Sequence, residues 1–232
     1  MEDQPITQDG HRRPALLIFD VNETLSDMSP LAGRFEDVGA PGHLAKTWFA
    51  ELLRDGFALA AAGTIEPFAR IAAELLRMRL DGLSLDRALD EAVDHVLAGF
   101  ADLAVHPDVP EGVGALADRG IRLVTLSNGS AQVAESLMER AGLRPHFERL
   151  LSVEEAGIWK PASGAYEYAL AECDVDAAEA MLVAVHPWDI DGAARAGLRT
   201  AWLDRAGGRY PAYFTAPDVT VSSLPELARA LS

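Results

Sequence analysis

Five short apolar runs, separated by longer helical patterns, organise this sequence. The first covers residues 15–19 and is followed by Asp20, and the others cover 121–126, 149–151, 181–185 and 200–203. A continuous apolar run of this length is typical of a strand buried on both faces of a parallel sheet. One of the intervening helical patterns, 131–141, follows the N-cap candidate Ser130 and precedes Gly142. The alternation predicts an α/β fold with a doubly wound parallel sheet.

The long stretch between the first and second apolar runs lacks a convincing strand pattern. Apolar residues instead recur at helical spacing over 43–55, 67–80 and 84–100, and Gly56 is expected to end the first of these helices. We therefore predict a helical cap domain over residues 29–105. It is inserted into a core domain formed by residues 14–28 and 106–232. Residues 1–13 are polar and unpatterned, and they are expected to form a loose N-terminal tail.

The charge of the chain argues against several classes of partner. Lys and Arg number 20 against 36 Asp and Glu, which gives a formal net charge of -16. This excess opposes binding to nucleic acid and to anionic membranes, where affinity comes chiefly from neutralising phosphates with basic residues. No apolar run approaches the ~20 residues that a membrane span needs, and residues 1–13 lack the apolar stretch of a secretory signal. We expect a cytoplasmic protein that binds neither nucleic acid nor a membrane.

The cysteine and histidine residues point to no metal centre. Cys173 is the only cysteine, so it forms no internal disulfide, and we interpret it as a small core residue. His43, His95, His106 and His146 have no partner at the spacing of metal ligands, so we interpret them as surface or core residues. The sequence predicts no metal and no cofactor.

Polar residues follow four of the apolar runs. They are Asp-Val-Asn-Glu-Thr at 20–24, Ser-Asn-Gly at 127–129, Lys160 after the third run, and His-Pro-Trp-Asp at 186–189. Ligands bind beyond the carboxyl ends of the strands in an open parallel sheet, so we expect these residues to meet at one edge. Taken singly, Asp20 has an alternative as a turn or cap residue and Lys160 as a surface ammonium. Their shared order and position favour a functional site.

This ordered set resembles the haloacid dehalogenase superfamily, and within it the L-2-haloacid dehalogenases. The resemblance spans residues 16–231. It rests on Leu-Ser-Asn-Gly-Ser at 126–130, Ala-Gly-Leu at 141–143, Leu-Leu-Ser-Val at 150–153, Lys160-Pro161 with Tyr166, and Trp188-Asp189 before Gly192-Ala193. It implies a Rossmann-like core with a helical cap and metal-free, cofactor-free hydrolysis through an aspartyl ester. A homodimer is compatible with the resemblance, although no sequence feature indicates one.

The nucleophile in this interpretation is Asp20. Its carboxylate attacks the halogen-bearing carbon of a short 2-haloalkanoic acid, expels halide and forms an ester, which water then cleaves to the 2-hydroxy acid. Lys160 holds Asp20 ionised through its opposite charge and takes the place of a metal ion. Thr24 orients Asp20 through its hydroxyl. Preference for the L enantiomer is what the family resemblance implies.

Other strand-end residues are assigned to substrate binding or orientation. Ser127 and Asn128, with the N–H groups of the next helix, are expected to bind the substrate carboxylate or the departing anion. Asp189 is expected to orient Lys160 or the hydrolytic water, with a helix N-cap as the alternative. Tyr166 matches an active-site tyrosine of the family, and packing on the helix after Lys160 is its alternative.

Two rival functions remain open at this point. Phosphatases that resemble the family carry a second Asp two residues after the nucleophile, whereas this chain has Asn22, which we count among the substrate-binding residues. They also carry an acidic residue where this chain has Ala184 or Val185, so a magnesium site lacks a carboxylate ligand. A phosphoesterase with weak Mg²⁺ dependence is the first rival. A non-catalytic relative that binds a carboxylate is the second.

One departure from the family pattern concerns the halide. Family members usually carry an arginine four residues before the leucine that matches Leu44, and this chain has Ala40 there. The halide would then need Asn128, Trp188, a backbone amide or a displaced arginine such as Arg34, whose alternative is a surface position.

A second departure suggests a different base. Glu23 stands where glycine is common in the family, and His186 stands where asparagine is usual. We hypothesise that Glu23 holds one nitrogen of His186 while the other nitrogen takes a proton from the water that cleaves the ester. The alternative is that His186 is a structural residue before Pro187.

Overall fold

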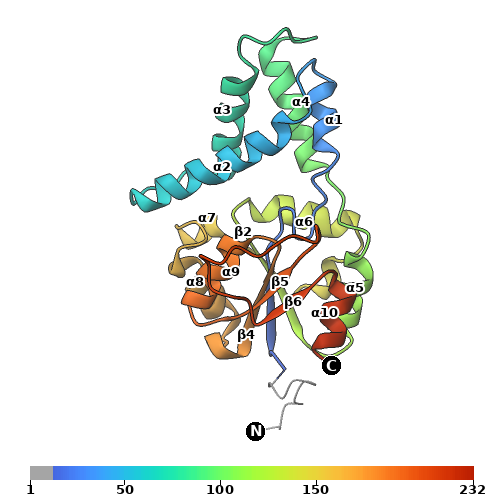
Figure 1. Cartoon of the computed structure of the whole chain (residues 1–232), viewed down its shortest axis with the longest axis vertical. Helices are drawn as coiled ribbons and strands as arrows, with labels where there is room; N and C mark the ends of the chain where they lie inside the picture. Colours follow the sequence, from blue (N-terminus) through green and yellow to red (C-terminus); the bar gives the residue numbers. More distant parts are fainter. Residues whose placement is uncertain (1–12) are drawn as a thin grey trace.

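The computed structural model describes residues 13–232 and has an α/β core below a group of helices (Figure 1). Residues 1–12, most of the expected tail, lie outside the described range. Within that range a six-stranded sheet has the order β3-β2-β1-β4-β5-β6, and every pair of neighbours is parallel. The strands are β1 (Leu16–Phe19), β2 (Arg122–Ser127), β3 (Arg149–Ser152), β4 (Ala180–Ala184), β5 (Arg199–Leu203) and β6 (Val219–Val221).

The five predicted apolar runs form β1 to β5. β1, β2, β4 and β5 have a neighbour on each side and helices on both faces, which favours apolar residues, whereas β3 is an edge strand whose first residue, Arg149, is exposed. All four residues of β1 and all five of β4 are buried. β1 lies in the middle of the sheet, with Leu16 opposite Arg122 of β2 and Ala180 of β4. The edge strand β6 was not predicted, since its three residues include the exposed Thr220 and form no apolar run.

Helices cover both faces of the sheet. Leu16 and Ile18 face α8 and α9, whereas Leu17 and Phe19 face α5, α6 and α10. These helices are α5 (Val109–Ala117), α6 (Ala131–Arg140), α8 (Ser163–Cys173), α9 (Pro187–Arg195) and α10 (Leu224–Ala230), and the core also has α7 (Val153–Ala156) and short 3-10 turns at Arg144–His146 and Ala177–Glu179. This two-sided covering confirms the predicted doubly wound core.

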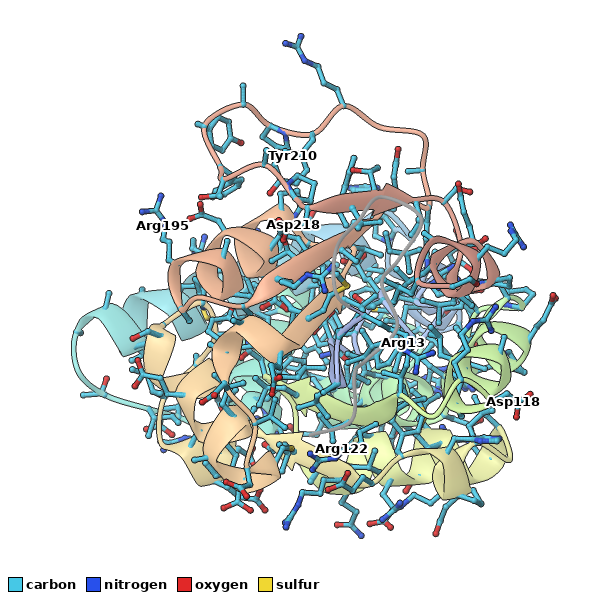
Figure 2. The ribbon with its side chains drawn as sticks, turned by 90° about the horizontal axis from the view of Figure 1, so that it is seen from below. Arg13, Asp118, Arg122, Arg195, Tyr210 and Asp218 are labelled. Carbon is cyan, nitrogen blue, oxygen red and sulfur yellow. The ribbon has the colours of Figure 1, made fainter. Side chains whose placement is uncertain are left out.

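The remaining helices are α1 (Leu31–Glu36), α2 (Leu44–Ala61), α3 (Phe68–Leu80) and α4 (Leu89–Ala101). They lie at the end of the core where the strands finish, and Figure 1 shows them above the sheet. Arg122, at the start of β2, marks the opposite end of the core and is seen from below in Figure 2. No helix among residues 13–232 combines the length and the apolar character that crossing a bilayer requires.

The chain passes between the core and these helices through two adjacent segments. Ser26 and Val105 form an antiparallel bridge. The Asp27 amide donates to the Ala104 carbonyl at 2.8 Å, and the His106 amide donates to the Leu25 carbonyl at 2.9 Å. These contacts support our proposal that residues 29–105 form a cap inserted into the core.

The prediction that Gly56 ends a helix is wrong, because α2 continues through it to Ala61. A Cβ atom at Gly56 would lie 2.2 Å from a ring carbon of Trp159, which belongs to the core. Trp159 also stacks on Phe68 of α3, and its indole N–H donates to the Glu66 carbonyl at 3.3 Å. Gly56 is therefore a site of close approach between the cap and the core.

Candidate active site

The predicted residues converge where the direction of strand order reverses. β1 has β2 on one side and β4 on the other, and such a switch point is the usual ligand site of a doubly wound sheet. Asp20 directly follows β1, Ser127 ends β2, and His186 lies between β4 and α9. Lys160 enters from the segment between α7 and α8, after β3. The sheet thus brings together residues that are up to 169 positions apart, from Asp20 to Asp189.

A buried ammonium lies between two buried carboxylates. Lys160 Nζ is 2.9 Å from Asp20 Oδ1 and 2.6 Å from Asp189 Oδ2, and all three side chains are almost completely inaccessible to solvent. The Thr24 hydroxyl donates to Asp20 Oδ2 at 2.6 Å and accepts from the Val185 amide at 3.1 Å. Both oxygens of Asp20 are therefore oriented, by an ammonium on one side and a hydroxyl on the other.

The surroundings shift the two carboxyl groups in opposite directions. Burial raises the pKa of Asp20, but the charges of Lys160 and His186 and the hydrogen bond from Thr24 outweigh it, so its pKa falls below the usual value. The pKa of Asp189 is raised, because burial and the nearby charge of Asp20 outweigh the effect of Lys160. Burial lowers the pKa of Lys160, but the two neighbouring carboxylates outweigh burial, so the pKa of Lys160 is raised above its ordinary value. Asp20 is thereby held as an anion at neutral pH.

Tyr166 fixes the other end of this array. Its hydroxyl donates to Asp189 Oδ1 at 2.6 Å and is 3.2 Å from the Asp189 carbonyl. Burial and the adjacent carboxylate raise the pKa of Tyr166 well above its ordinary value, so the phenol keeps its proton. Asp189 thus orients Lys160, as one of the predicted alternatives stated, and Tyr166 orients Asp189.

Ser127 and Asn128 differ in what they contact. The side-chain amide of Asn128 forms two hydrogen bonds with the backbone of Lys160. Its oxygen accepts from the Lys160 amide at 3.0 Å, and its nitrogen donates to the Lys160 carbonyl at 3.3 Å. This arrangement differs from the expected role of Asn128 as an anion ligand, because the side chain holds the backbone that carries Lys160. The Ser127 hydroxyl accepts from the Gly129 amide at 2.9 Å, which leaves its own hydrogen to donate.

His186 lies beside both Asp20 and Glu23, but not in the arrangement that we expected. Its Nε2 is 3.7 Å from Asp20 Oδ2, 3.7 Å from Glu23 Oε2 and 3.1 Å from the main-chain carbonyl oxygen of Asn22, which accepts a hydrogen bond whenever Nε2 carries a proton. One nitrogen therefore faces both carboxylates, whereas the hypothesis placed Glu23 on the opposite nitrogen. The imidazole stacks on Trp188 with ring centroids 5.0 Å apart.

Cavities reach this array from two sides, between the cap and the core. A cavity of about 170 Å³ is bordered by Asn22 and Ser127 and by α3 and α4. A larger one, of about 820 Å³, is bordered by Glu23 and His186 and by α1 and α2. Both are larger than a three-carbon acid requires, so a small organic anion has room next to Asn22 and Ser127 in the first and next to Glu23 and His186 in the second. Asp20 is not among the described residues that border either cavity, but His186 Nε2 is 3.7 Å from Asp20 Oδ2.

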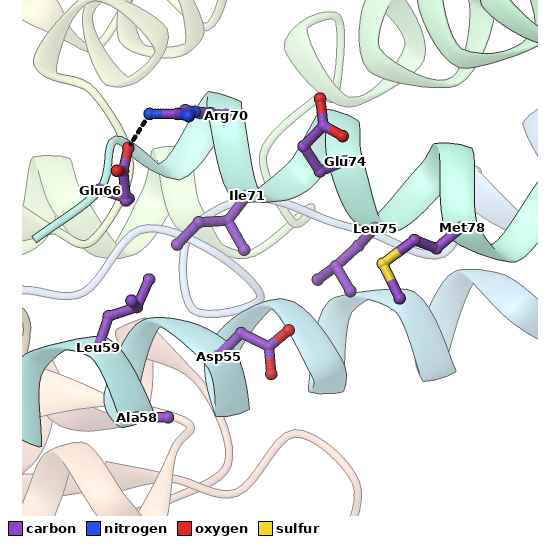
Figure 3. Close-up of a pocket in the computed structure, with 9 residues that line it drawn as sticks. All are labelled: Asp55, Ala58, Leu59, Glu66, Arg70, Ile71, Glu74, Leu75 and Met78. Atoms are coloured by element: carbon purple, nitrogen blue, oxygen red, sulfur yellow. Dashed lines mark hydrogen bonds and ion pairs between the residues drawn. The ribbon is translucent and has the colours of Figure 1, made fainter. Parts of the chain in front are cut away.

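A groove elsewhere in the cap has no part in this site. It has a volume of about 470 Å³ and lies between α2 and α3, where Ile71, Leu75 and Met78 of α3 point toward α2, which contributes Leu59 (Figure 3). The predicted site residues are absent from its lining within the described part of the chain. The chemistry-bearing residues lie instead between the cap and the sheet.

The structure does not bring the arginine candidate to the two cavities. Ala40 is buried, and neither Ala40 nor Arg34 is among the described residues that border these two cavities. Arg34 packs across α4, where a Cβ atom at Gly99 would lie 2.5 Å from its Cγ. Trp188 stays near the ammonium, with its ring centroid 5.9 Å from Lys160 Nζ.

Two residues that the sequence did not single out for this site contact the loop after β1. His106 Nε2 donates to the Glu23 carbonyl at 3.0 Å. Arg205 donates to the Thr24 carbonyl through Nη2 at 2.9 Å and Nε at 3.2 Å. These contacts join residues 83 and 181 positions apart, so no local pattern indicates them.

The described residues offer no cluster of three or more His, Cys, Asp or Glu side chains with the geometry of a metal site. Asp20 and Asp189 are the carboxylates nearest to forming one, and the Lys160 ammonium lies between them. The array as it stands can hold an anionic carboxylate in a buried position and balance its charge with an ammonium.

Comparison with known proteins agrees with this geometry. The model of the haloacid dehalogenase-like hydrolases matches residues 14–197. The (S)-2-haloacid dehalogenase of Pseudomonas sp. (strain YL) is 30% identical over 211 residues, which cover 90% of each chain. The solved L-2-haloacid dehalogenase from Xanthobacter autotrophicus is 25% identical with a TM-score of 0.83, over 93% of this chain and 97% of that one.

A second structure of the Xanthobacter autotrophicus enzyme has chloropropionic acid covalently bound. Its TM-score is 0.84 at 23% identity, with the same coverage of 93% and 97%. The family model covers residues 14–197, which is most of the chain. This chain therefore belongs to the haloacid dehalogenase-like hydrolases.

Proposed function

We propose that this hydrolase removes halide from short 2-haloalkanoic acids and forms the 2-hydroxy acid through an ester on Asp20. The observation that carries the proposal is the buried Asp20 carboxylate, held ionised by Lys160 at 2.9 Å and oriented by Thr24 at 2.6 Å. A carboxylate that is aimed and partly dehydrated is a competent nucleophile toward carbon. The relatives that match over nine tenths of their length are named for the same substrate class.

In the first step a carboxylate oxygen of Asp20 attacks C2 of the substrate. A C–O bond forms as the carbon–halogen bond breaks, and the electron pair leaves with the halide. The Ser127 hydroxyl borders the small cavity and donates to the substrate carboxylate, while Asn22 lines the same space. Lys160 carries its proton when the attack begins, because two carboxylates stabilise its charge, and Asp189 still neighbours the ammonium once Asp20 is an ester. The covalently bound chloropropionic acid of the Xanthobacter enzyme gives a precedent for a covalent step in that protein.

In the second step water attacks the acyl carbon of the Asp20 ester. His186 Nε2 lies 3.7 Å from Asp20 Oδ2, so it stands beside the carbon that the water must reach. With the proton of the neutral imidazole on Nδ1, Nε2 takes the proton from the attacking water, and the main-chain carbonyl of Asn22 at 3.1 Å then accepts a hydrogen bond from the new N–H. Glu23, 3.7 Å from the same nitrogen, stabilises the imidazolium through its charge. The bond between the acyl carbon and the ester oxygen breaks, and the 2-hydroxy acid leaves with that oxygen and takes a proton from the imidazolium. Asp20 regains its second oxygen from the water, and the restored carboxyl group loses its remaining proton to solvent.

A single-turnover reaction in ¹⁸O-water tests the proposal. Enzyme in excess over 2-chloropropionate or 2-bromopropionate should release halide and incorporate ¹⁸O into the peptide that contains Asp20, because water attacks the acyl carbon of the ester. Asp20→Asn is the matched control and should release no halide. Label found only in the 2-hydroxy acid would contradict the ester and indicate direct attack of water on the substrate.

The phosphoesterase alternative has its own readout. The side-chain amide of Asn22 cannot donate and recover the proton of a leaving alcohol. Phosphomonoester hydrolysis that depends on added Mg²⁺, without halide release from either haloacid, would support that alternative over dehalogenation.

A further inference from the structure

We propose that His106 is a positioning residue that holds the peptide after Glu23, so that the Glu23 carboxylate faces His186. The inference rests on the proposed function, because it assigns a role in the ester-hydrolysis step. The feature that needs explaining is the backbone of Glu23, which has a φ of 62°.

That conformation is rare for a residue with a side chain. Among residues 13–232, Glu23 and Asp174 are the non-glycine residues with positive φ. Asp174 ends helix α8 at an exposed position, where a left-handed residue is common. Glu23 instead lies in the loop that carries Asp20 and Thr24, and unfavourable backbone conformations of this kind persist only where the surroundings enforce them.

Hydrogen bonds to both the carbonyl and the amide of Glu23 hold its backbone in this conformation. His106 Nε2 donates to its carbonyl at 3.0 Å, and its amide donates to the Ser26 hydroxyl at 3.3 Å. The next carbonyl, that of Thr24, accepts two bonds from Arg205, whose remaining nitrogen donates to Asp108 at 2.6 Å. Two successive carbonyls are thus held by side chains from distant parts of the chain.

His106 is itself firmly placed. Its amide donates to the Leu25 carbonyl at 2.9 Å, where the chain returns from the cap to the core. The side chain therefore reaches the Glu23 carbonyl from a segment that is tied to the same loop. If Glu23 relaxed from positive to negative φ, its carbonyl would leave His106 and its side chain would swing away from the His186 ring.

This geometry predicts which chemical step depends on His106. Alkylation uses Asp20, Lys160 and Thr24. Thr24 has hydrogen bonds of its own that do not involve His106: its hydroxyl bonds to Asp20 and to the Val185 amide, and its carbonyl accepts from Arg205. Hydrolysis of the ester uses His186 with Glu23, which His106 positions. Loss of His106 should therefore slow the second step and leave the first step intact.

The test separates the two steps by rapid quench with 2-bromopropionate, with halide as one readout and the mass of the Asp20 peptide as the other. His106→Ala should release its first equivalent of halide within about twofold of wild type. Its ester hydrolysis should slow by about 10- to 100-fold, the usual effect of misplacing a catalytic group by about an ångström, so the ester accumulates. His106→Gln, which keeps an N–H donor, should recover most of the rate. His146→Ala, at an exposed histidine, should match wild type in both steps.

A double variant distinguishes a positioning role of His106 from a purely structural one, through the rate of ester hydrolysis. Glycine adopts positive φ without strain and has no carboxylate, so His106→Ala in a Glu23→Gly background should slow ester hydrolysis by less than about twofold. The same 10- to 100-fold loss in both backgrounds would overturn the proposal, as would equal slowing of halide release and ester hydrolysis.

If His106→Ala does not fold, His106→Asn, whose amide is too short to reach the Glu23 carbonyl, is judged by the same two criteria. Wild-type enzyme that never forms the ester refutes the proposed function, whereas wild-type ester with unaffected His106 variants refutes this inference alone.

Discussion

Lys160 Nζ lies 2.9 Å from Asp20 Oδ1, and both side chains are buried beneath the cap. With Asp189 at 2.6 Å on the other side of the ammonium, the group carries two negative charges and one positive charge in a site closed to bulk water. Charges buried in this way are retained only when they are paired and hydrogen-bonded. The pair therefore links two properties, the stability of the core and the ionisation of the nucleophile.

Lys160→Met should lower the stability of the fold and the activity together. Removing one partner of a buried ion pair typically costs about 3–5 kcal/mol, because it leaves an uncompensated charge, and urea unfolding measures this loss. Since Lys160 lowers the pKa of Asp20, any residual halide release should need a higher pH than in wild type. Lys46→Met, at an exposed lysine, is the control for stability. Unchanged stability in Lys160→Met would contradict the charge pairing.

His186→Asn should leave ester formation intact and stop turnover. A positioned base contributes about 10²- to 10⁴-fold to a proton-transfer step, and the amide cannot take the proton. Rapid quench should therefore show one equivalent of halide per enzyme, followed by slow release of the 2-hydroxy acid. Glu23→Gln, which keeps the side-chain shape and removes the charge, should slow the same step to a smaller extent. Steady-state halide release at the wild-type rate in His186→Asn would rule out this base.

Tyr166→Phe should destabilise the protein more than the matched change at Tyr168. The Tyr166 hydroxyl donates to the buried Asp189 carboxylate at 2.6 Å, and a hydrogen bond to a charged group contributes about 1.5–3 kcal/mol. Tyr168 donates to Glu155 at the surface, where most substitutions change stability by less than about 0.5 kcal/mol. Denaturant unfolding of the two variants gives the comparison, and equal effects would contradict the structural role of Tyr166.

Gly56→Ala should disturb the contact between the cap and the core. The added methyl group would lie 2.2 Å from the Trp159 ring, so α2 must shift away from the residue that directly precedes Lys160. Overpacking of this kind typically costs about 1–3 kcal/mol, and halide release should fall as Lys160 is displaced. Gly114→Ala, in helix α5 with open space at the Cβ position, should instead stabilise the helix by up to about 1 kcal/mol. Thermal unfolding distinguishes the opposite signs.

Asp191→Asn should remove part of the acid sensitivity of the fold. The bond from Arg195 and the two bonds from Thr215 lower the pKa of Asp191 to about 2, below its ordinary value of 3.8. Its stabilising contribution is therefore complete above pH 3.8 and is lost as the pH falls toward 2. The difference in unfolding free energy between wild type and Asp191→Asn should shrink across that window. Arg195→Gln should reduce the same difference in part, and a difference that does not change with pH would contradict this assignment.

The sequence sufficed to predict the four inner strands, because strands covered on both faces are mostly apolar, and it also predicted the edge strand β3 from a weaker apolar run. β1 and β4 show this most clearly. The edge strand β6 escaped prediction, since a short strand with an exposed residue has no such requirement. The end of α2 was predicted wrongly for a different reason: Gly56 has the local signature of a helix end, but its contact with Trp159 decides its role.

At the site, the strand ends were enough to predict that Asp20, Lys160 and Asp189 meet, because parallel strands finish at the same edge of a sheet. The orientation of each side chain could not be predicted in the same way. Three contacts at the site depend on segments far apart in the chain. One nitrogen of His186 faces both carboxylates, Asn128 bonds to the backbone of Lys160, and His106 donates to the Glu23 carbonyl. Burial and strand position follow from local residue patterns, whereas these contacts form only once segments far apart in the chain are packed together, so the tertiary structure alone decides them.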